Sequence, residues 1–433
     1  MNLYKKLLAR AEEGRPVRAG LIGAGKFGAM FLSQVPSTPG LSVTAIADLD
    51  PERARQACAA VGWPAELSQK VAFTDSGEAL IARGDVDVVI ESTGDPIAGI
   101  DHALSAIAAV KHIVMVNVEA DCLAGPALAA RARMAGSVYS LAYGDQPALV
   151  CEMVDWARAC GFHVVAAGKG TKYLPQYHAV TPDEVWDHYG LSADEARAVG
   201  MNPQMFNSFL DGTKSAIEMA AIANATGLAP PADGLGFPPC GADELASVLR
   251  PRQQGGVLEG DGMVEVVSSL KHDGAPVAHD LRWGVYCVFR APNAYAAACF
   301  REYGLRTDPS GQFAAMFKPY HLIGLELAVS VLNAAFRGEP TGAPDGFRAD
   351  VAAVAKRDLK AGERLDGEGG YTVWGKLLPA RRSLDIGALP IGFAHGVKLK
   401  RAVKAGEIVR RSDVALEETS PAFRVRREAE ALA

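Results

Sequence analysis

Three glycines near the N-terminus are spaced as in a turn that holds phosphate groups. The sequence Gly-Ala-Gly-Lys-Phe-Gly (23–28) follows the apolar run 17–22 and precedes a stretch of helical character. In that context Gly23 allows a tight turn, Gly25 lets a pyrophosphate approach the backbone, and Gly28 lets the helix pack against the strand. The free N–H groups and the positive dipole end of the helix then face the phosphates. The candidate cofactor contacts in this turn are Gly23, Gly25, Lys26, Phe27 and Gly28.

An acidic residue stands at the spacing expected for a ribose contact of the same cofactor. Asp48 follows the second apolar run, 42–47, about twenty residues after the glycine motif. A carboxylate there accepts hydrogen bonds from the adenosine ribose hydroxyls and repels a 2′-phosphate, so the sequence favours NAD over NADP. Arg53 and Arg55, on the next predicted helix, could soften this preference and keep NADP possible. The alternative is a glycine turn without a ligand and an aspartate that caps a helix.

Two further strand ends should face the cofactor, because ligands of parallel sheets bind beyond the carboxyl ends of the strands. The segment 89–94 closes the fourth predicted strand, and Val116-Asn117 closes the fifth. Thr93, Gly94 and Asn117 are therefore candidates along the path from the adenosine to the nicotinamide.

Hydride transfer also needs a group that exchanges a proton with the substrate oxygen, and a lysine can be that group or a fixed positive charge. The candidates are Lys169, Lys214 and Lys318. Lys214 and Glu218 stand at positions i and i+4 of the predicted helix 213–226, so they share a face. That helix is otherwise poor in charge, which favours a pair that points into a cleft over a lone surface ion pair. We expect Lys214 to polarise or protonate the substrate oxygen, Glu218 to orient it, and Lys169 to lie across the cleft at the nicotinamide end.

Lys169 and His321 each have a functional and a structural interpretation. Lys169 lies between two glycines after the predicted strand 162–167, where an open backbone suits a phosphate, but a solvated loop lysine fits as well. His321 starts the predicted helix 321–336, which contains Glu326. It is either a proton shuttle at neutral pH or a helix-start residue bonded to the backbone.

Four acidic residues near strand ends or helix starts could supply oxygen ligands to Mg²⁺, which would polarise two substrate oxygens. They are Glu119, Asp121, Asp145 and Glu152. Their spacing matches no metal motif, and capping explains any one of them better, so a divalent metal stays an open alternative.

Alternating strands and helices position these residues. From Val17 to about Leu141, short apolar runs alternate with Ala- and Leu-rich helical stretches, which predicts an α/β doubly wound parallel sheet. The following region mixes strands and helices and predicts an α+β domain, and residues 338–350 are rich in Gly, Pro and Asp, as in a linker.

A short repeat lies beyond this linker. Lys-Ala-Gly-Glu occurs at 360–363 and again at 404–407, each time between apolar positions. This pattern suits a tight turn between two short strands, and a duplication explains it better than chance. The charged residues 418–433 are expected to fray.

Composition narrows the class of protein. The chain has 433 residues, 49% of them hydrophobic and 22% charged, with a formal net charge of −6. This balance is typical of a globular protein and lacks the clustered basic excess of nucleic-acid binding. The seven cysteines form no Cys-x-x-Cys pair, so we expect reduced thiols in the cytoplasm. Residues 1–14 suggest an amphipathic helix rather than a signal peptide, and no apolar run is long enough to cross a bilayer.

Several segments resemble the homoserine dehydrogenase-like oxidoreductases. They are IGAGKFG (22–28), ESTG (91–94), VMVNVEAD (114–121) and AYGDQP (142–147). A closer resemblance, over nearly the whole chain, is to the subgroup with an added C-terminal SAF domain, which includes the 1-deoxy-D-xylulose 5-phosphate reductoisomerase-like enzymes. Its further segments here are GKG (168–170), DGTKSAIEMAAIANATGL (211–228), GGVL (255–258), PYHLIGLE (319–326) and the Lys-Ala-Gly-Glu repeats.

The resemblance implies three domains and a reaction. The domains are a Rossmann domain (15–145), an α+β catalytic and dimerisation domain (146–340) and a small β-rich SAF domain (350–418), in a homodimer. The reaction is NAD(P)-dependent reduction, or isomerisation and reduction, of a small keto-sugar or keto-sugar phosphate. The reductoisomerase-like pattern has arginines at the end of the second strand, whereas this chain has Asp48.

Two other functions fit the residues. Asp48 favours an NAD-dependent dehydrogenase of a hydroxy acid or sugar acid in carbohydrate catabolism. A non-catalytic dinucleotide-binding sensor is the third possibility, and the presence of Lys169, Lys214 and Glu218 argues against it.

Overall fold

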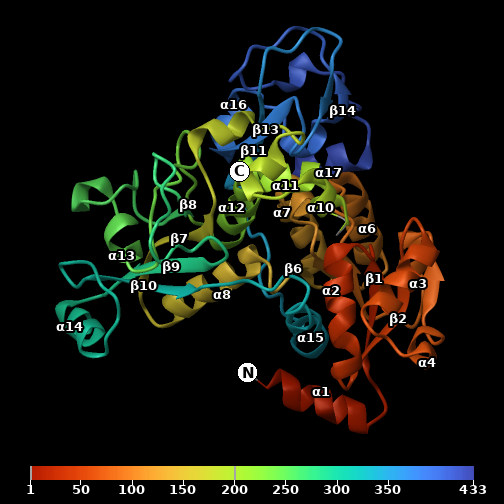
Figure 1. The fold of residues 1–433 in the computed structure, drawn as a ribbon. Coiled ribbons are helices and arrows are strands. Elements are labelled where there is room, and N and C mark those ends of the chain that lie inside the picture. Colours follow the sequence, from red (N-terminus) through yellow and green to blue (C-terminus); the bar gives the residue numbers. More distant parts are fainter. Residues whose placement is uncertain (1, 199–200) are drawn as a thin grey trace. The chain divides into compact units, whose positions relative to one another are not determined.

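The computed structural model describes residues 2–198 and 201–433, and the chain divides into two compact units. The first unit contains the segment that ends at Glu152 together with His321–Asp345 and Ser420–Leu432. The second contains Met153–Tyr320 and Gly346–Thr419. Figure 1 colours the chain by sequence, so the discontinuous segments of each unit can be followed there.

The first unit is built on a parallel sheet of six strands in the order β3-β2-β1-β4-β5-β6. This is the order of a Rossmann fold, so the predicted α/β fold class is confirmed. The strands are β1 (Val17–Ile22), β2 (Leu41–Ala47), β3 (Ala72–Thr74), β4 (Val88–Glu91), β5 (His112–Met115) and β6 (Tyr139–Leu141). All of β4 and β6 and nearly all of β1 and β5 are buried, which explains their continuous apolar runs.

Helices follow the strands along the chain. In the first unit they are α1 (Leu3–Glu12), α2 (Lys26–Gln34), α3 (Pro51–Ala60), α4 (Ala65–Ser68), α5 (Gly77–Ile81), α6 (Pro96–Ala108), α7 (Val118–Ala135), α15 (Ala328–Arg337) and α17 (Pro421–Glu430), and α8 spans Gln146–Ala159. The predicted helix 321–336 therefore starts later than expected, at Ala328. His321 and Glu326 lie in the non-helical segment before it.

The C-terminal residues are ordered, so the expectation that they fray is wrong. Helix α17 packs on α7, and its Arg426 is fully buried. Arg426 donates hydrogen bonds to the Leu123 carbonyl (3.2 Å) and to Glu430 (2.9 Å). Arg131 forms a two-pronged ion pair with Glu428. A charged sequence can thus form an anchored helix when its charges have partners on a neighbouring helix.

The second unit contains a four-stranded mixed sheet in the order β10-β9-β7-β8. Its strands are β7 (His163–Thr171), β8 (Met263–Ser268), β9 (Val285–Arg290) and β10 (Phe313–Lys318). Helix α12 (Thr213–Thr226) has the predicted bounds, and left-handed glycines flank both its ends. It packs on β7 and β8. The other helices are α9 (Val185–Tyr189), α10 (Ala193–Ala198), α11 (Pro203–Leu210), α13 (Leu245–Val248), α14 (Ala294–Glu302) and the 3-10 turn η2 (Pro175–Ala179).

The C-terminal part of this unit is rich in short strands. They are β11 (Ala349–Ala355), β12 (Arg364–Asp366), β13 (Val373–Pro379) and β14 (His395–Lys398), with a short helix α16 (Ala380–Asp385). The two Lys-Ala-Gly-Glu copies form equivalent turns, and they pair with each other through Leu359 and Val403. Each glutamate accepts a hydrogen bond from the backbone N–H of its own lysine and from an upstream arginine. The repeat is therefore a structural duplication.

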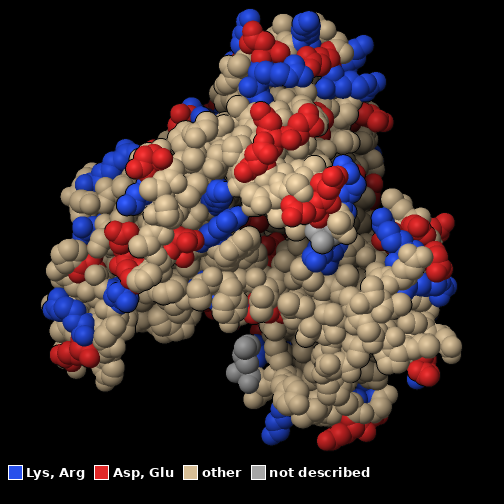
Figure 2. Space-filling model, in the orientation of Figure 1, with Lys and Arg blue, Asp and Glu red and all other residues tan. Residues whose placement is uncertain are grey.

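No helix among the described residues is long and apolar enough to span a membrane. On the face shown in Figure 2, basic and acidic side chains are intermingled rather than gathered by sign.

Candidate functional site

The glycine turn after β1 has the shape that a bound phosphate group needs. Gly23 has a positive φ of 93°, and a side chain there would lie 2.8 Å from the Ser92 carbonyl oxygen. Gly28 lies against the Gly23 carbonyl, so it too must lack a side chain. Gly25 is the N-cap of α2, where no side chain caps the helix, and a Cβ added there would meet no heavy atom within 4 Å. Open space thus faces uncapped N–H groups, including those of the first turn that starts at Lys26 and Phe27.

The Asp48 carboxylate lies directly beside this turn. Asp48 is buried, and its Oδ2 accepts a hydrogen bond from the Ala24 N–H at 2.9 Å. Its Oδ1 accepts from the Asp50 N–H and from the exposed Arg53 side chain, the latter at 2.5 Å. Arg55 instead places its guanidinium over the Phe73 ring. Of the two arginines that could soften the preference for NAD, Arg53 therefore contacts the carboxylate.

The predicted residues at the ends of β4 and β5 are linked by hydrogen bonds. Asn117 caps α7 with its side-chain oxygen, while its Nδ2 donates to the Asp95 carbonyl at 2.8 Å and to Thr93 at 3.3 Å. Thr93 in turn donates to the buried Glu91 at 2.6 Å. Gly94 follows Thr93 directly and has a positive φ of 77°. These strand ends therefore form one hydrogen-bonded edge next to the glycine turn of β1.

A buried histidine, His102, contacts the buried Glu91 carboxylate. His102 Nδ1 lies 3.3 Å from Glu91 Oε1, and both side chains are buried. Burial lowers the pKa of His102, but the hydrogen bond to Glu91 and the charges of Glu91, Glu78 and Asp101 outweigh it, so the pKa is raised overall. The histidine thus tends to carry the charge that compensates Glu91.

In the second unit, two of the predicted catalytic residues form a buried ion pair. Lys169 on β7 contacts Glu218 on α12, and only 7% and 4% of their side chains are exposed. Lys214 lies one turn earlier on the same helix and is half-buried. The structure therefore brings Lys169 and Glu218 together, and helix geometry places Lys214 near them. His321 belongs to the first unit, and Lys318 lies over the Tyr320 ring.

Lys169 does not lie in a phosphate-binding loop, because β7 continues to Thr171. Its neighbouring glycines have a packing role instead. A side chain at Gly168 would overlap the Glu265 carbonyl of β8, and one at Gly170 would overlap the Leu281 carbonyl. The glycines therefore let adjacent backbone segments approach closely, and the lysine side chain is directed to the helix-covered face of the sheet.

A polar and aromatic cluster that the sequence did not predict lies at the start of α12. His178 Nδ1 lies 2.7 Å from the Asp211 carbonyl oxygen, and its Nε2 lies 2.9 Å from the Tyr173 hydroxyl. The His178 ring stacks on Trp374 at 3.7 Å, and the Tyr173 ring stacks on Phe237 at 3.8 Å. Tyr173 and His178 lie in one short segment. Asp211, Phe237 and Trp374 come from three others, so no local motif identifies the cluster.

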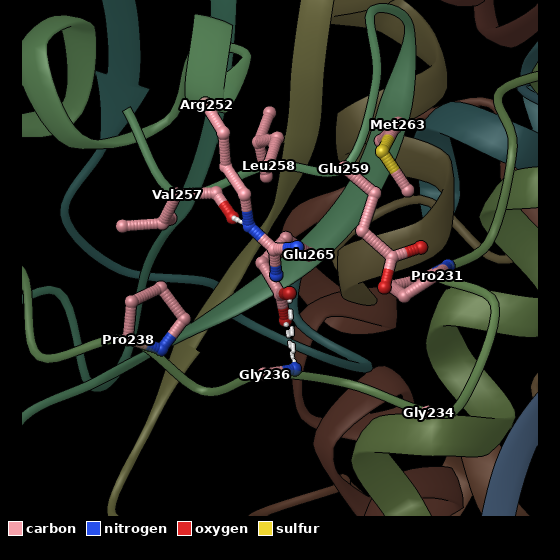
Figure 3. A pocket seen from close by; sticks show the side chains of 10 residues that line it. All are labelled: Pro231, Gly234, Gly236, Pro238, Arg252, Val257, Leu258, Glu259, Met263 and Glu265. Atoms are coloured by element: carbon pink, nitrogen blue, oxygen red, sulfur yellow. Dashed lines mark hydrogen bonds between the residues drawn. The ribbon is translucent and has the colours of Figure 1, made fainter. Parts of the chain in front are cut away.

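A strained loop holds one wall of this cluster. Phe237 has a positive φ of 47°, a backbone conformation that costs an aromatic residue about 1–2 kcal/mol. The buried Glu265 carboxylate accepts hydrogen bonds from the N–H groups of Gly236, Phe237 and Val266 and so fixes the loop. Burial raises the pKa of Glu265 to about 7. Glu265, Arg252 and Glu259 line a cavity of about 210 Å³. Figure 3 shows their side chains.

Three of the four acidic candidates for metal binding have hydrogen bonds to other groups, and the fourth, Glu119, lies in the first turn of α7. Asp121 is fully buried and accepts a hydrogen bond from the Tyr139 hydroxyl, and burial raises its pKa to about 7. Asp145 accepts a hydrogen bond from the Gln146 N–H, and Glu152 from the Tyr143 hydroxyl. Within residues 2–198 and 201–433, no group of three His, Cys, Asp or Glu side chains is arranged to hold a metal ion.

Two family models match the chain, one mainly in each of the two compact units. Residues 144–327 match the model of the catalytic domain of the oxidoreductase DRL, and residues 17–116 match that of the oxidoreductase family with an NAD-binding Rossmann fold. No curated protein sequence matches the chain.

Similar solved structures are oxidoreductases. Biliverdin reductase from Synechocystis sp. PCC 6803 is 20% identical over 37% of this chain, which covers 48% of that protein, with a TM-score of 0.28. A probable dehydrogenase from Thermotoga maritima is 14% identical over 71% of this chain and 69% of its own, with a TM-score of 0.31. A putative myo-inositol dehydrogenase from Sinorhizobium meliloti 1021 is 14% identical over 75% of this chain and 90% of its own, with a TM-score of 0.39.

The family models agree with the glycine turn, which fits a dinucleotide, and support an NAD(P)-dependent enzyme over a non-catalytic sensor. The chain thus combines an N-terminal region that matches an NAD-binding Rossmann fold with a region that resembles the catalytic domain of the oxidoreductase DRL.

Proposed function

We propose that this oxidoreductase reduces a small keto-sugar or keto-sugar phosphate, either directly or after rearrangement of its carbon skeleton. The observation that carries the proposal is the buried Lys169–Glu218 pair on β7 and α12. Burying two charges costs free energy of folding that a surface pair would not. A role in binding and polarising a substrate oxygen would explain why the chain contains this pair despite its cost.

The first unit would hold the dinucleotide. Gly23, Gly25 and Gly28 shape the turn, and the first N–H groups of α2 would bind the pyrophosphate. Asp48 would accept hydrogen bonds from the adenosine ribose once Arg53 shares or leaves its carboxylate. Thr93, Gly94 and Asn117 would line the path toward the nicotinamide. When bound, the cofactor supplies or accepts the hydride.

The second unit would handle the substrate. Lys214 would donate a hydrogen bond or a proton to the substrate oxygen, and its positive charge would stabilise negative charge that develops there. Glu218 and Lys169 would hold this group in position. We further propose that the protein is a homodimer in the cytoplasm, that residues 350–418 form an SAF domain, and that His321 has a secondary role as a proton shuttle.

An NAD-dependent dehydrogenase of a hydroxy acid or sugar acid is the second candidate. Asp48 favours it, because its carboxylate lies 2.9 Å from the Ala24 N–H, where it would disfavour a 2′-phosphate. NAD serves oxidation more often than reduction, so this candidate predicts the opposite direction of hydride transfer.

A substrate screen separates the two candidates. Nicotinamide absorbance is followed with NADH and NADPH against keto-sugars and keto-sugar phosphates, and with NAD and NADP against hydroxy acids and sugar acids. Oxidation of NADH or NADPH in the first set supports the proposal. Turnover in the second set alone would contradict it and favour the dehydrogenase.

A further inference from the structure

The end of β7 leads directly into a hydrogen-bonded tyrosine and histidine. Tyr173 follows the last strand residue, Thr171, by two positions, and His178 lies in the 3-10 turn η2. Both side chains are partly exposed, so a ligand can reach them. Stacking holds both rings in place: the Tyr173 ring stacks on Phe237, and the His178 ring stacks on Trp374.

The direction of the hydrogen bond follows from the groups involved. The Asp211 carbonyl can only accept, so His178 Nδ1 must carry the hydrogen of their 2.7 Å contact. In the neutral imidazole, Nε2 is then an acceptor, and the Tyr173 hydroxyl at 2.9 Å must donate to it. The lone pairs of the tyrosine oxygen stay available for a ligand. This is a path along which one proton can move between the ligand, Tyr173 and His178.

The same helix start connects this pair to the lysines. Asp211 and Gly212 immediately precede α12, and a Cβ added at Gly212 would lie 3.3 Å from the His178 ring. Lys214 stands in the first turn of that helix. The strand that carries Lys169 ends just before Tyr173. Tyr173 and the lysines are therefore positioned by the same two elements, β7 and α12.

We propose that Tyr173 is the catalytic acid–base of this enzyme and that His178 is the positioning residue that exchanges its proton. In the reducing direction the substrate carbonyl carbon gains the hydride, and its oxygen takes the proton from the Tyr173 hydroxyl. Reduction therefore requires that Nε2 of His178 first takes a proton from water. Tyr173 then recovers its proton from Nε2, which returns His178 to the neutral form. Oxidation runs the same steps backwards. The inference rests on the proposed function and limits Lys214 to electrostatic stabilisation.

The charged surroundings define the expected pH dependence. His178 faces Asp211, which raises its pKa, and Lys356 and Lys376, which lower it, while Glu265 faces Tyr173. Burial is the largest effect, and it lowers the pKa of His178 overall. The histidine therefore stays neutral at pH 7 and can accept the proton during oxidation. Oxidation should fall only when the pH drops through this lowered pKa, and reduction should rise there.

The test compares Tyr173→Phe with Tyr177→Phe, using the best substrate from the screen in both directions. Tyr173→Phe keeps the ring stacked on Phe237 and removes only the hydroxyl, so kcat should fall about 10²–10⁴-fold with unchanged NADH affinity. Tyr177→Phe removes a neighbouring hydroxyl that is not part of the pair and should leave kcat unchanged. His178→Gln should remove the acid limb of the oxidation profile.

The possible results separate the assignment of Tyr173 from the proposed function. Full activity of Tyr173→Phe, or an unchanged acid limb in His178→Gln, would overturn the Tyr173 assignment while the proposed function stands. If the unmodified enzyme turns over none of the substrates, the proposed function fails and the assignment fails with it. A loss of kcat equal in Tyr177→Phe would show a structural effect and would also contradict the assignment.

Discussion

The two units assemble their polar groups in different ways. In the first unit, the groups beside the glycine turn come mostly from consecutive residues: Gly23 to Gly28 form the turn, and Asp48 bonds to its backbone. In the second unit, Lys169, Glu218, Tyr173 and His178 come from a strand, a helix, a short loop and a 3-10 turn. Local motifs therefore identify a cofactor site, whereas the groups proposed for chemistry depend on long-range packing.

The largest expected effect on stability comes from the buried pair of the second unit. Lys169→Met leaves the Glu218 carboxylate buried without the ammonium group, which should lower the free energy of unfolding by about 3–5 kcal/mol. Chemical denaturation measures this change. The double variant Lys169→Met with Glu218→Gln should recover most of the stability, because no buried charge is then left. A double variant as unstable as the single one would show that the pair is not a coupled unit.

The next largest effect is the pH dependence of stability that one buried carboxyl group in each unit causes. The pKa values of Asp121 and Glu265 rise to about 7 from ordinary values of 3.8 and 4.5. The folded state therefore holds more protons than the unfolded state between about pH 4 and 7, so stability falls as the pH rises through this window. For Glu265 the change amounts to about 3 kcal/mol.

Denaturation at several pH values tests this comparison. Asp121→Asn and Glu265→Gln should each flatten the pH dependence, because neither amide titrates. Glu265→Gln should also loosen Phe237, since the amide replaces one acceptor oxygen with a donor next to backbone N–H groups. A steeper rather than a flatter pH profile would contradict the assignment of either group.

The smallest predicted effect concerns cofactor choice. Asp48→Ser removes the carboxylate and leaves Arg53, its present partner, free to attract a 2′-phosphate. We expect the ratio of NADPH to NADH affinity to rise about tenfold, equal to about 1.4 kcal/mol. Fluorescence titration with both cofactors measures it. An unmodified protein that binds NADPH as well as NADH would contradict the role given to Asp48.

Sequence reasoning located features that depend on neighbouring residues. The turn at 23–28 and helix 213–226 follow from glycine spacing, apolar composition and the glycine stop, and the structure reproduces both. The same reasoning placed Lys169 after its strand, because glycines normally end strands. Here they allow close contact with the β8 and Leu281 backbones, which only the folded sheet reveals.

Other features required information from distant residues. The helix at 421–430 appeared too charged to be ordered, but its buried Arg426 has partners on α7 and within its own helix. Tyr173 and His178 lie five residues apart, but Phe237 and Trp374 are distant in sequence, and only packing brings them onto the two rings. The one local signal was Phe237 in a Pro/Gly-rich loop, which indicates a constrained backbone but not its partner.

The central claim is that the first unit binds the dinucleotide and the second performs the substrate chemistry. The most direct test measures the Kd for NADH and kcat for Lys214→Met, with Gly25→Val as the matched variant of the first unit. The account predicts that Gly25→Val weakens NADH binding at least about tenfold, because its side chain fills the space open to the pyrophosphate. It predicts that Lys214→Met keeps the Kd and lowers kcat about 10²–10⁴-fold. Near-normal turnover in Lys214→Met, or a loss of NADH affinity as large as in Gly25→Val, would contradict it.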